Sequence, residues 1–212
     1  MLALTQFETC SKTAPAPSSA STTLQSPAPA LLPASAESSK APAVGSDGTR
    51  VYEIGDTGPA GGIIFYDKGS DEDGWRYLEA APSDQSASFP WFSGTFKYIF
   101  DMKTDTAVGA GKANTDAIVA AQGEGAYAAS LCKDRNINGF ADWFLPSKDE
   151  LDLMYRNLKK AGLGGFGESQ LWSSSLGINN EVAWNQRFSD GSQDYGDFSN
   201  YDRCSVRACR AF

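Results

Sequence analysis

Residues 11–47 contain no aromatic side chain and few charges, and Ser, Ala, Pro and Thr dominate this stretch. Such a composition cannot bury enough apolar surface to offset the backbone entropy that is lost on folding. We therefore expect residues 1–50 to be a short stub followed by a disordered tether. Nearly all aromatic residues lie in residues 51–212, which are long enough to form one domain with a substantial core.

The net charge of −8 and the lack of a long basic run restrict the partners of the chain. Both features argue against nucleic acids and anionic membrane surfaces. The chain also contains no histidine, which is the commonest general base and metal ligand in proteins. We therefore expect a non-enzymatic protein with no cofactor, no catalytic residues and no metal site.

Cys132, Cys204 and Cys209 lie in the expected domain, and an odd number of cysteines forms no closed disulfide framework. If residues 205–212 form one strand, Cys204 and Cys209 point to opposite faces. They are then about 16 Å apart, too far for a bridge to each other. A bridge from Cys132 to either of them remains open.

An apolar stub, Cys10 and a Ser/Pro/Ala-rich tether follow one another at the N-terminus, as in a bacterial lipoprotein. The stub is short, has no basic residue, and carries Glu8 and Thr9 before the cysteine, unlike a normal signal peptide. We expect export to the cell surface or outer membrane, with a lipid on Cys10 as the membrane contact. A periplasmic or secreted form is the alternative.

Short runs of β-branched and aromatic residues predict the strands of the domain. Residues 51–54 and 63–66 flank the sequence GDTGPAGG, which predicts a turn between two paired strands. This turn lacks the Lys-Ser/Thr pair of a phosphate loop. Further strands are expected at residues 75–79, 171–174, 182–188 and 205–212.

Two helical regions are expected between these strands. Asn114 or Thr115 caps a first helix that breaks at Gly123, and a second piece covers residues 126–133. Further along the chain, an S-x-x-E capping box predicts a helix over residues 148–161. Its box residues are Ser147 and Glu150, and its apolar stripe comprises Leu151, Met154, Tyr155 and Leu158.

This order of elements predicts an α+β fold with two helices on a small twisted antiparallel sheet and long irregular loops. Each tryptophan is next to strand-like sequence, so all five are expected in the core. They are Trp75, Trp91, Trp143, Trp172 and Trp184.

Residues 192–205 read SQDYGDFSNYDRCS and contain no Leu, Ile, Val or Met. Such a segment cannot fill a core. Tyr supplies large, stiff contact area, and Ser, Asn and Gly supply adaptable hydrogen bonds, which is the mixture that binding surfaces use. The segment therefore predicts a ligand-binding face, and a solvated hairpin or loop is the alternative.

Six motifs follow one another along residues 51–212: IGDTGPAGGIIFYDKG, GWRYLEAAP, GFADWFLPSKDELDLMY, LWSSS, AWNQRFSDG and VRACRAF. Together they resemble bacterial, Treponema-type surface proteins with a C-type-lectin-like domain, in the subset that shares its fold with formylglycine-generating enzymes. They are also similar to the C-terminal domain of the Legionella collagen-like adhesin. The resemblance implies this fold for residues 51–212.

The tail resembles the variable segment of proteins that are diversified by retroelements through adenine-directed mutagenesis of AAY codons. The products of such codons include Asn, Asp, Ser, Tyr, Gly, Phe, Cys and Arg. Every residue from 192 to 205 except Gln193 belongs to this set. The resemblance implies a receptor- or adhesin-like surface protein with a variable region at residues 171–212, and a non-variable paralogue is the alternative.

The same resemblance implies that polar and aromatic side chains of the tail contact a protein or glycan ligand. Tyr195 and Tyr201 are the expected anchors. Trp184, Phe188 and Gly191 are expected to be scaffold. The full set of expected contacts is Asn179, Asn180, Asn185, Arg187, Ser189, Asp190, Ser192, Asp194, Tyr195, Asp197, Phe198, Asn200, Tyr201, Asp202 and Arg203.

Three rival functions follow from the same resemblance. Formylglycine-generating enzymes bind copper through paired cysteines, but matching VRACRAF to their terminal motif places Ala208 where a cysteine is needed. Calcium-dependent lectins end their signature in a carboxylate, whereas Trp184 is followed by Asn185 and Gln186. Glycosaminoglycan adhesion conflicts with the net acidity of the chain.

Overall fold

In a computed structural model of the chain, the described residues are 43–44, 50–93, 102–177, 181–197 and 203–212. All of them belong to the unit Ser38–Phe212 of the two units into which the chain divides. The expected tether falls almost entirely outside these residues, and so does Cys10. Within the described part, a few helices accompany mainly antiparallel sheets, so the domain is α+β. No described helix has the length and apolar character that crossing a membrane requires.

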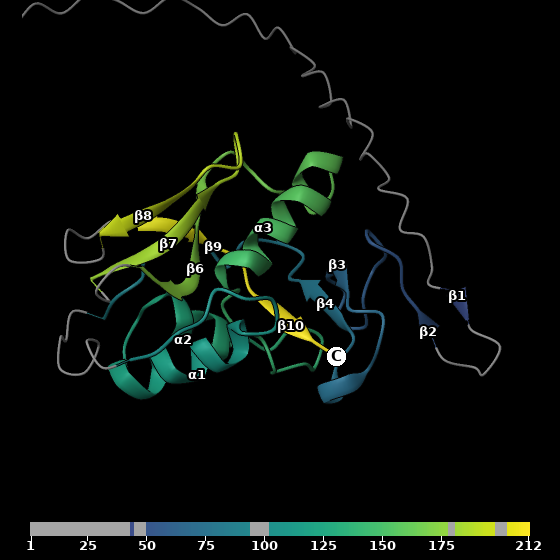
Figure 1. The fold of residues 1–212 in the computed structure, drawn as a ribbon, viewed down its shortest axis with the longest axis horizontal. Helices are drawn as coiled ribbons and strands as arrows, with labels where there is room; N and C mark the ends of the chain where they lie inside the picture. Colours follow the sequence, from purple (N-terminus) through teal and green to yellow (C-terminus); the bar gives the residue numbers. More distant parts are fainter. Residues whose placement is uncertain (1–42, 45–49, 94–101, 178–180, 198–202) are drawn as a thin grey trace, which may run out of the picture. The chain divides into compact units, whose positions relative to one another are not determined.

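A three-stranded sheet, referred to below as the smaller sheet, joins two early strands to the last strand of the chain (Figure 1). Its central strand is β4 (Tyr77–Ala80). β3 (Ile63–Asp67) and β10 (Cys209–Ala211) pair with β4 on either side, both antiparallel. Residues from both ends of the domain therefore share one sheet.

The expected pairing of residues 51–54 with β3 is wrong. β2 (Arg50–Val51) instead pairs with β1 (Ala43–Val44). Backbone contact with β3 starts only at Gly55, whose N–H donates to the Ile64 carbonyl at 2.8 Å. Gly55 has a φ of 93°, a left-handed backbone conformation that directs residues 51–54 away from β3.

The glycine-rich turn before β3 closes around a buried carboxylate. Glu79 on β4 is 0% exposed, and it accepts hydrogen bonds from the backbone N–H groups of Ala60 at 3.4 Å and Gly62 at 2.6 Å. A Cβ atom at Gly58 or Gly62 would overlap the Glu79 side chain or the Ala80 carbonyl. The GDTGPAGG turn therefore needs its glycines, because its backbone encloses the carboxyl group of Glu79.

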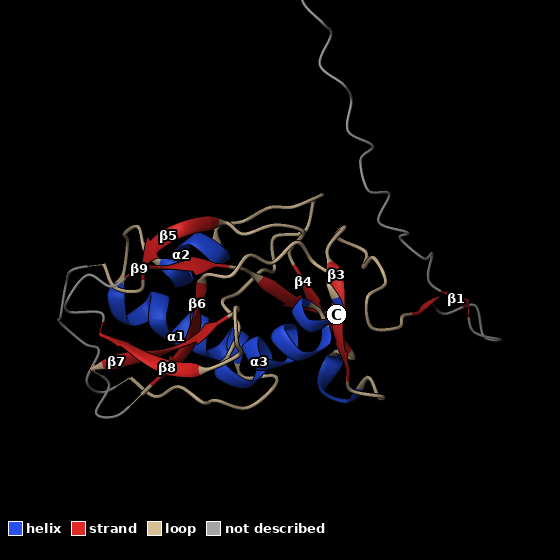
Figure 2. Cartoon of the chain, turned by 90° about the horizontal axis from the view of Figure 1, so that it is seen from above, coloured by secondary structure: helices blue, strands red, loops and turns tan. Residues whose placement is uncertain are grey.

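The larger sheet contains most of the tail (Figure 2). Its strand order is β5-β9-β6-β7-β8, with β8 at one edge. Neighbouring strands are antiparallel except β6 and β9, which are parallel where Leu171 meets Ser205. The bounds are Ser86–Pro90 for β5, Gln170–Leu176 for β6, Val182–Arg187 for β7, Gln193–Asp197 for β8 and Arg203–Val206 for β9.

Residues 205–212 do not form the single strand that their pattern predicts. β9 ends at Val206 in the larger sheet, and β10 begins at Cys209 in the smaller one. Arg207 lies between these two strands. Hydrogen bonds hold its side chain there and interrupt the strand. Cys204 and Cys209 consequently lie in different sheets.

α1 (Gly111–Gln122) begins before the residues expected to cap it. Asn114 and Thr115 are instead buried inside the helix. Thr115 Oγ1 accepts a hydrogen bond from Leu145 N–H at 3.0 Å, and Asn114 Oδ1 accepts one from Asp105 N–H at 2.9 Å. These side chains therefore fix neighbouring loops. α2 (Ala128–Lys133) follows the predicted break at Gly123.

α3 (Lys148–Asn157) confirms the predicted capping box. Glu150 N–H donates to Ser147 Oγ at 3.2 Å, and Ser147 N–H donates to the Glu150 carboxylate at 2.7 Å. The helix continues as η2 (Lys159–Ala161) and ends at Gly162, which has a φ of 73°. α3 contacts β3 of the smaller sheet and β6 and β7 of the larger one, so it connects the two sheets (Figure 1).

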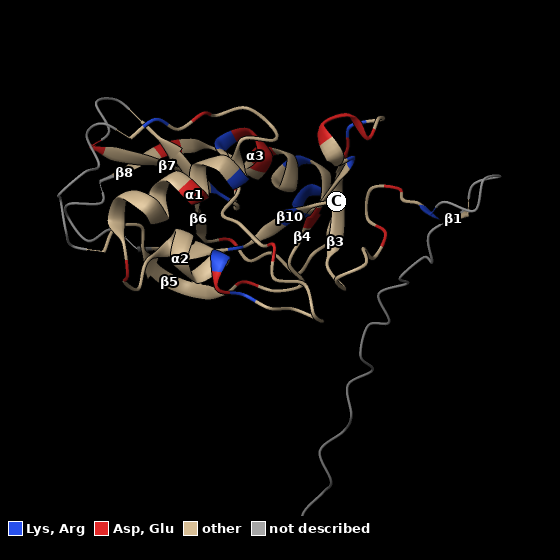
Figure 3. Ribbon diagram, turned by 90° about the horizontal axis from the view of Figure 1, so that it is seen from below, with Lys and Arg blue, Asp and Glu red and all other residues tan. Residues whose placement is uncertain are grey.

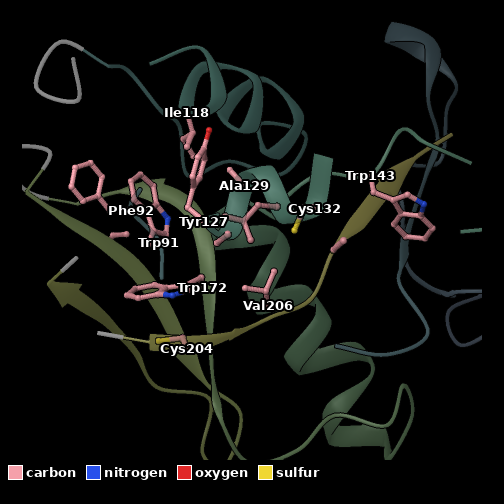
Figure 4. Close-up of a cluster of buried hydrophobic side chains, with 14 of the residues drawn as sticks. Trp91, Phe92, Ile118, Tyr127, Ala129, Cys132, Trp143, Trp172, Cys204 and Val206 are labelled. Carbon is pink, nitrogen blue, oxygen red and sulfur yellow. The ribbon is translucent and has the colours of Figure 1, made fainter. Parts of the chain in front are cut away.

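The core prediction holds for three of the five tryptophans. Trp91, Trp143 and Trp172 are buried, and Figure 4 shows Trp91 and Trp172 among side chains of the main apolar cluster. Trp75 and Trp184 are only half-buried, so the prediction is wrong for these two. Their rings border the surface of the domain.

Two arginines of the VRACRAF sequence are buried partners of carboxylates. Arg207 is 1% exposed, and its Nε lies 2.6 Å from Asp84. Arg210 donates two hydrogen bonds of 2.8 Å to Asp142 and lies 3.3 Å from Glu79. A buried guanidinium is stable only when its donors are satisfied, so this motif has a structural role.

Candidate functional site

The candidate site is the hairpin of β7 and β8 at the edge of the larger sheet. Trp184 on β7 is directly opposite Tyr195 on β8 in the antiparallel register. The strands are joined by a tight turn, in which Gly191 has a φ of 81° and its N–H donates to the Arg187 carbonyl at 2.8 Å. A Cβ at position 191 would also overlap the Tyr155 ring, which supports the scaffold role expected for this glycine.

Trp184 and Tyr195 form an aromatic pair that reaches solvent. Their ring centroids lie 4.0 Å apart at an interplanar angle of 39°. Tyr195 is 39% exposed, one of few large apolar side chains that reach this level among the described residues. Lys148 Nζ lies 4.8 Å from the Trp184 ring centroid, in the position of a cation–π contact. Two rings and one cation thus form a compact surface cluster.

The start of α3 holds this hairpin in place. Gln193 Nε2 donates to the Lys148 carbonyl at 3.1 Å. Gln186 Nε2 donates to Asp152 at 2.9 Å and to the Gly191 carbonyl at 3.1 Å. Because the capping box fixes where α3 starts, it also fixes Lys148 beside Trp184. The aromatic pair is therefore positioned by buried and local hydrogen bonds before any ligand arrives.

The opposite face of the hairpin is packed against the core. Asn185 is only 4% exposed, so it does not belong to the expected contact surface. Asn185 is paired with Trp172 across the sheet, and Gly196 lies so close to the Trp172 ring that a Cβ would overlap it. The period of two along a strand explains this correction, because Asn185 follows the outward Trp184 and must face inward.

The exposed members of the expected set gather around the turn and β8. They are Arg187, Ser189, Asp190, Ser192, Asp194 and Tyr195. Asn179, Asn180, Phe198, Asn200, Tyr201 and Asp202 lie outside the described residues, while Asp197 and Arg203 are placed only as members of β8 and β9.

Charges of both signs lie on this surface. Arg187 lies 3.7 Å from Asp190, and Ser192 donates to the same carboxylate through its hydroxyl at 2.7 Å and its N–H at 2.9 Å. The hydrogen bonds from Ser192, with Arg187 nearby, lower the pKa of Asp190. The site therefore has no dominant charge, and it suits a ligand with mixed polar and apolar groups more than a simple ion.

Two members of the cluster were not expected as contacts. Trp184 is assigned to the scaffold by the sequence, and Lys148 is not singled out. Alternation along residues 182–188 places Trp184 on the same side as Val182 and Phe188, so the sequence gives no signal that the tryptophan reaches the surface. Lys148 has no signal either, because its approach to Trp184 depends on the packing of α3 against β7.

The three described cysteines lie on different elements of the fold. Cys132, Cys204 and Cys209 are all buried, and burial raises the pKa of the Cys132 and Cys209 thiols. No disulfide joins the described cysteines, so the bridge left open for Cys132 is not formed. Among the described residues, no group of three or more His, Cys, Asp and Glu side chains could hold a metal ion.

Comparison with known proteins adds no relative. A scan of the chain against protein-family models finds no match, and a search of the curated proteins finds none either.

Proposed function

We propose that the chain is a non-catalytic, receptor- or adhesin-like protein whose tail binds a protein or glycan ligand. The observation that carries this proposal is the exposed pair of Trp184 and Tyr195, with Lys148 over the tryptophan ring. Tyr and Trp side chains on a rigid backbone supply a large share of the binding energy in interfaces. Their fixed placement reduces the entropy that is lost when a ligand binds.

The proposal includes a C-type-lectin-like fold of the formylglycine-generating-enzyme type. Two features support it. The smaller sheet unites β3 and β4 with the terminal strand β10, and the larger sheet carries the tail hairpin beside long loops. The motif order along residues 51–212 gives independent support.

The proposal also includes diversification of residues 171–212 by a retroelement. Ser189, Asp190, Ser192 and Asp194 are exposed, and all four belong to the products of AAY-codon mutagenesis. Exposed positions tolerate exchange, whereas Phe188 and the strand β6 are buried. Display on the cell surface, with a lipid on Cys10 as one anchor, would make such a surface available to external ligands.

A binding array tests the central claim. Purified secreted and cell-surface proteins, together with glycans, are probed with the full chain and with its Trp184→Ala and Tyr195→Ala variants. We expect at least one ligand whose affinity falls about tenfold or more in both variants while their melting temperatures stay close to that of the unchanged protein. The proposed site would be contradicted if every ligand found bound both variants with the affinity of the unchanged protein.

Gene sequencing tests the diversification separately. Comparison of the 3′ end of this gene between isolates should show substitutions confined to asparagine-type codons. A near-identical template repeat and a reverse transcriptase gene should lie nearby. An invariant 3′ end without these neighbours would remove diversification and leave the binding proposal in place.

A further inference from the structure

A cleft lies beside the last residue of the chain, which Figure 1 marks with C. It has a volume of about 770 Å³ and is lined chiefly by Arg50, Tyr52, Trp75, Arg76, Tyr77 and Phe212. This volume falls in the range of about 300–1,000 Å³ that is typical of ligand sites. None of these residues belongs to the cluster of Trp184, Tyr195 and Lys148.

The rings of this cleft are held rigidly. Tyr52, Tyr77 and Phe212 pack against one another with centroids 5.2, 5.4 and 5.5 Å apart. Trp75 is held by Lys68, whose Nζ lies 4.4 Å from the ring centroid, and by Tyr66 at 6.3 Å. Trp75 and Phe212 nevertheless remain partly exposed. The cleft therefore offers fixed aromatic surface to a ligand.

The indole of Trp75 differs from those of the core. The N–H groups of Trp91, Trp143 and Trp172 each donate to a backbone carbonyl. Within the part of the chain that the structure describes, the indole N–H of Trp75 donates no such hydrogen bond to a backbone carbonyl. A half-buried donor beside a cleft is available to an acceptor on a ligand, in exchange for water.

Arg76 supplies further donors in a fixed plane. Its Nε and Nη2 donate to Asp67 at 2.7 and 2.9 Å, which leaves Nη1 outside this fork. The ion pair holds the Arg76 guanidinium in place, and this group lies 4.9 Å from the Tyr77 ring centroid. The cleft thus combines flat apolar surface with hydrogen-bond donors, and it favours a ligand that has apolar rings and carbonyl acceptors.

An extended proline-rich peptide has this chemistry. In the polyproline II helix the backbone makes no internal hydrogen bonds, so its carbonyl groups are available, and its pyrrolidine rings pack on aromatic side chains. We propose that the cleft is a second binding site of this protein and takes a proline-rich peptide of a partner, through Trp75, Phe212 and Arg76.

The rim of the cleft adds a preference for basic residues next to the prolines. Asp71 lines the cleft, and Glu72 and Asp73 follow in η1 (Glu72–Gly74), where all three are exposed. Figure 3 shows this acidic turn at the edge of the domain. Lys68 lies 3.6 Å from Asp73 and Arg50 also lines the cleft, so Asp71 and Glu72 are the carboxylates left to attract a positive charge on the peptide. This attraction would weaken as salt is added.

Fluorescence anisotropy tests the proposal with a labelled peptide of ten prolines flanked by one arginine at each end. We expect saturable binding to the full chain and a loss of about tenfold or more in affinity for Trp75→Ala. Trp75→Phe keeps an aromatic ring without the indole N–H, so its affinity should be intermediate. A peptide with glycine and serine in place of the prolines should bind far more weakly.

Trp184→Ala is the matched control, because it removes a half-buried tryptophan from the other surface and should leave peptide affinity unchanged. Melting temperatures confirm that each variant is folded. The proposal is overturned if the unchanged chain does not bind the peptide, if Trp75→Ala binds it equally well, or if the cleft instead binds maltohexaose in a Trp75-dependent manner. None of these outcomes affects the proposal for the tail surface.

Discussion

Trp184 and Tyr195 are direct cross-strand neighbours in β7 and β8, and their ring centroids lie 4.0 Å apart. This pairing orders two large rings at the edge of a sheet without burying them. Asn185, the next residue after Trp184, turns to the other face and packs beside Trp172. Neighbouring residues of one hairpin therefore serve contact and packing, and the predictions below separate the two roles.

Removal of the Tyr195 ring should weaken ligand binding far more than folding. Tyr195→Ala deletes exposed contact area, so we expect about tenfold or greater loss of affinity for a ligand found on the array. The free energy of unfolding should change by less than about 1 kcal/mol, because the ring is 39% exposed. Titration of the ligand and urea denaturation measure the two effects.

Tyr195→Phe is the control for this experiment, since it retains the ring and its packing on Trp184. Its affinity should remain within a few-fold of the unchanged protein unless the hydroxyl group itself contacts the ligand. A large loss of stability in Tyr195→Ala would instead assign the ring to the scaffold.

Asp194 should protect the edge of the sheet from self-association. Its carboxylate accepts a hydrogen bond from the backbone N–H of Tyr195 at 2.8 Å, and β8 pairs only with β7 among the described strands. Exposed strand edges are templates for pairing with another chain, and charges on them oppose this. We expect Asp194→Ala to shift the protein toward dimers in concentration-dependent sedimentation.

Asp190→Ala removes a charge of the same sign from the turn, but not from the strand edge, and it should remain at the original oligomeric state. Equal association of both variants would show that net charge matters and that the hydrogen bond to Tyr195 does not.

Gly196 should resist substitution although it lies within the segment expected to vary. A Cβ at this position would overlap the Trp172 ring, which is fully buried and cannot move aside. Gly196→Ser should therefore lower the free energy of unfolding by about 1–3 kcal/mol, as overpacking does. Gly167→Ser is the matched control, because its nearest neighbour, Ser169 Oγ, would lie 3.9 Å from the new Cβ. A Gly196→Ser variant as stable as the control would show that β8 can shift outward.

The buried arginines should contribute more to stability than any charge at the surface. Arg210→Ala leaves Glu79 and Asp142 without their partner, and breaking a buried pair in this way costs about 3–5 kcal/mol. Arg187→Ala removes an exposed cation that is 3.7 Å from Asp190, and such pairs are worth about 0–1 kcal/mol. Urea denaturation of both variants measures the difference. Similar values for the two would contradict the structural role of VRACRAF.

What the sequence predicts well is local. The capping box of Ser147 and Glu150 spans four residues, and the helix starts where it indicates. The crossing between β9 and β10 is not local, because Arg207 there bonds to Asp84, 123 residues away. No feature of residues 205–212 indicates this partner. The alternation of these residues alone therefore predicts a single strand.

The sequence also predicts only some features of the candidate site. Composition correctly indicates that Ser189, Asp190 and Ser192 are at the surface, since polar turn residues have no reason to be buried. The inward direction of Asn185 depends on the register of β7, and the contact of Lys148 with Trp184 depends on how α3 packs. Composition contains neither kind of information.

Glu150 should make the stability of the domain depend on pH near neutrality. Burial raises the pKa of this carboxyl group to about 7, although hydrogen bonds from Ser147, Gly109 and Gly111 oppose the shift. The folded domain then retains a proton that the unfolded chain has lost at the same pH. The stabilisation from this proton is complete below about pH 4.5 and disappears as pH rises through about 7. The melting temperature should therefore fall between pH 5 and pH 8 through this group.

Glu150→Gln cannot lose a proton and should flatten this part of the profile. The variant presents an amide donor to one of the backbone N–H groups around it, so we expect a loss of about 1–3 kcal/mol at pH 5. The change in slope is the decisive quantity, because the chain has no histidine that could titrate in the same interval. Calorimetry at several pH values measures both effects. An unchanged slope in Glu150→Gln would show that Glu150 does not titrate in this range, and Glu79, whose pKa burial also raises, would then be the next residue to test.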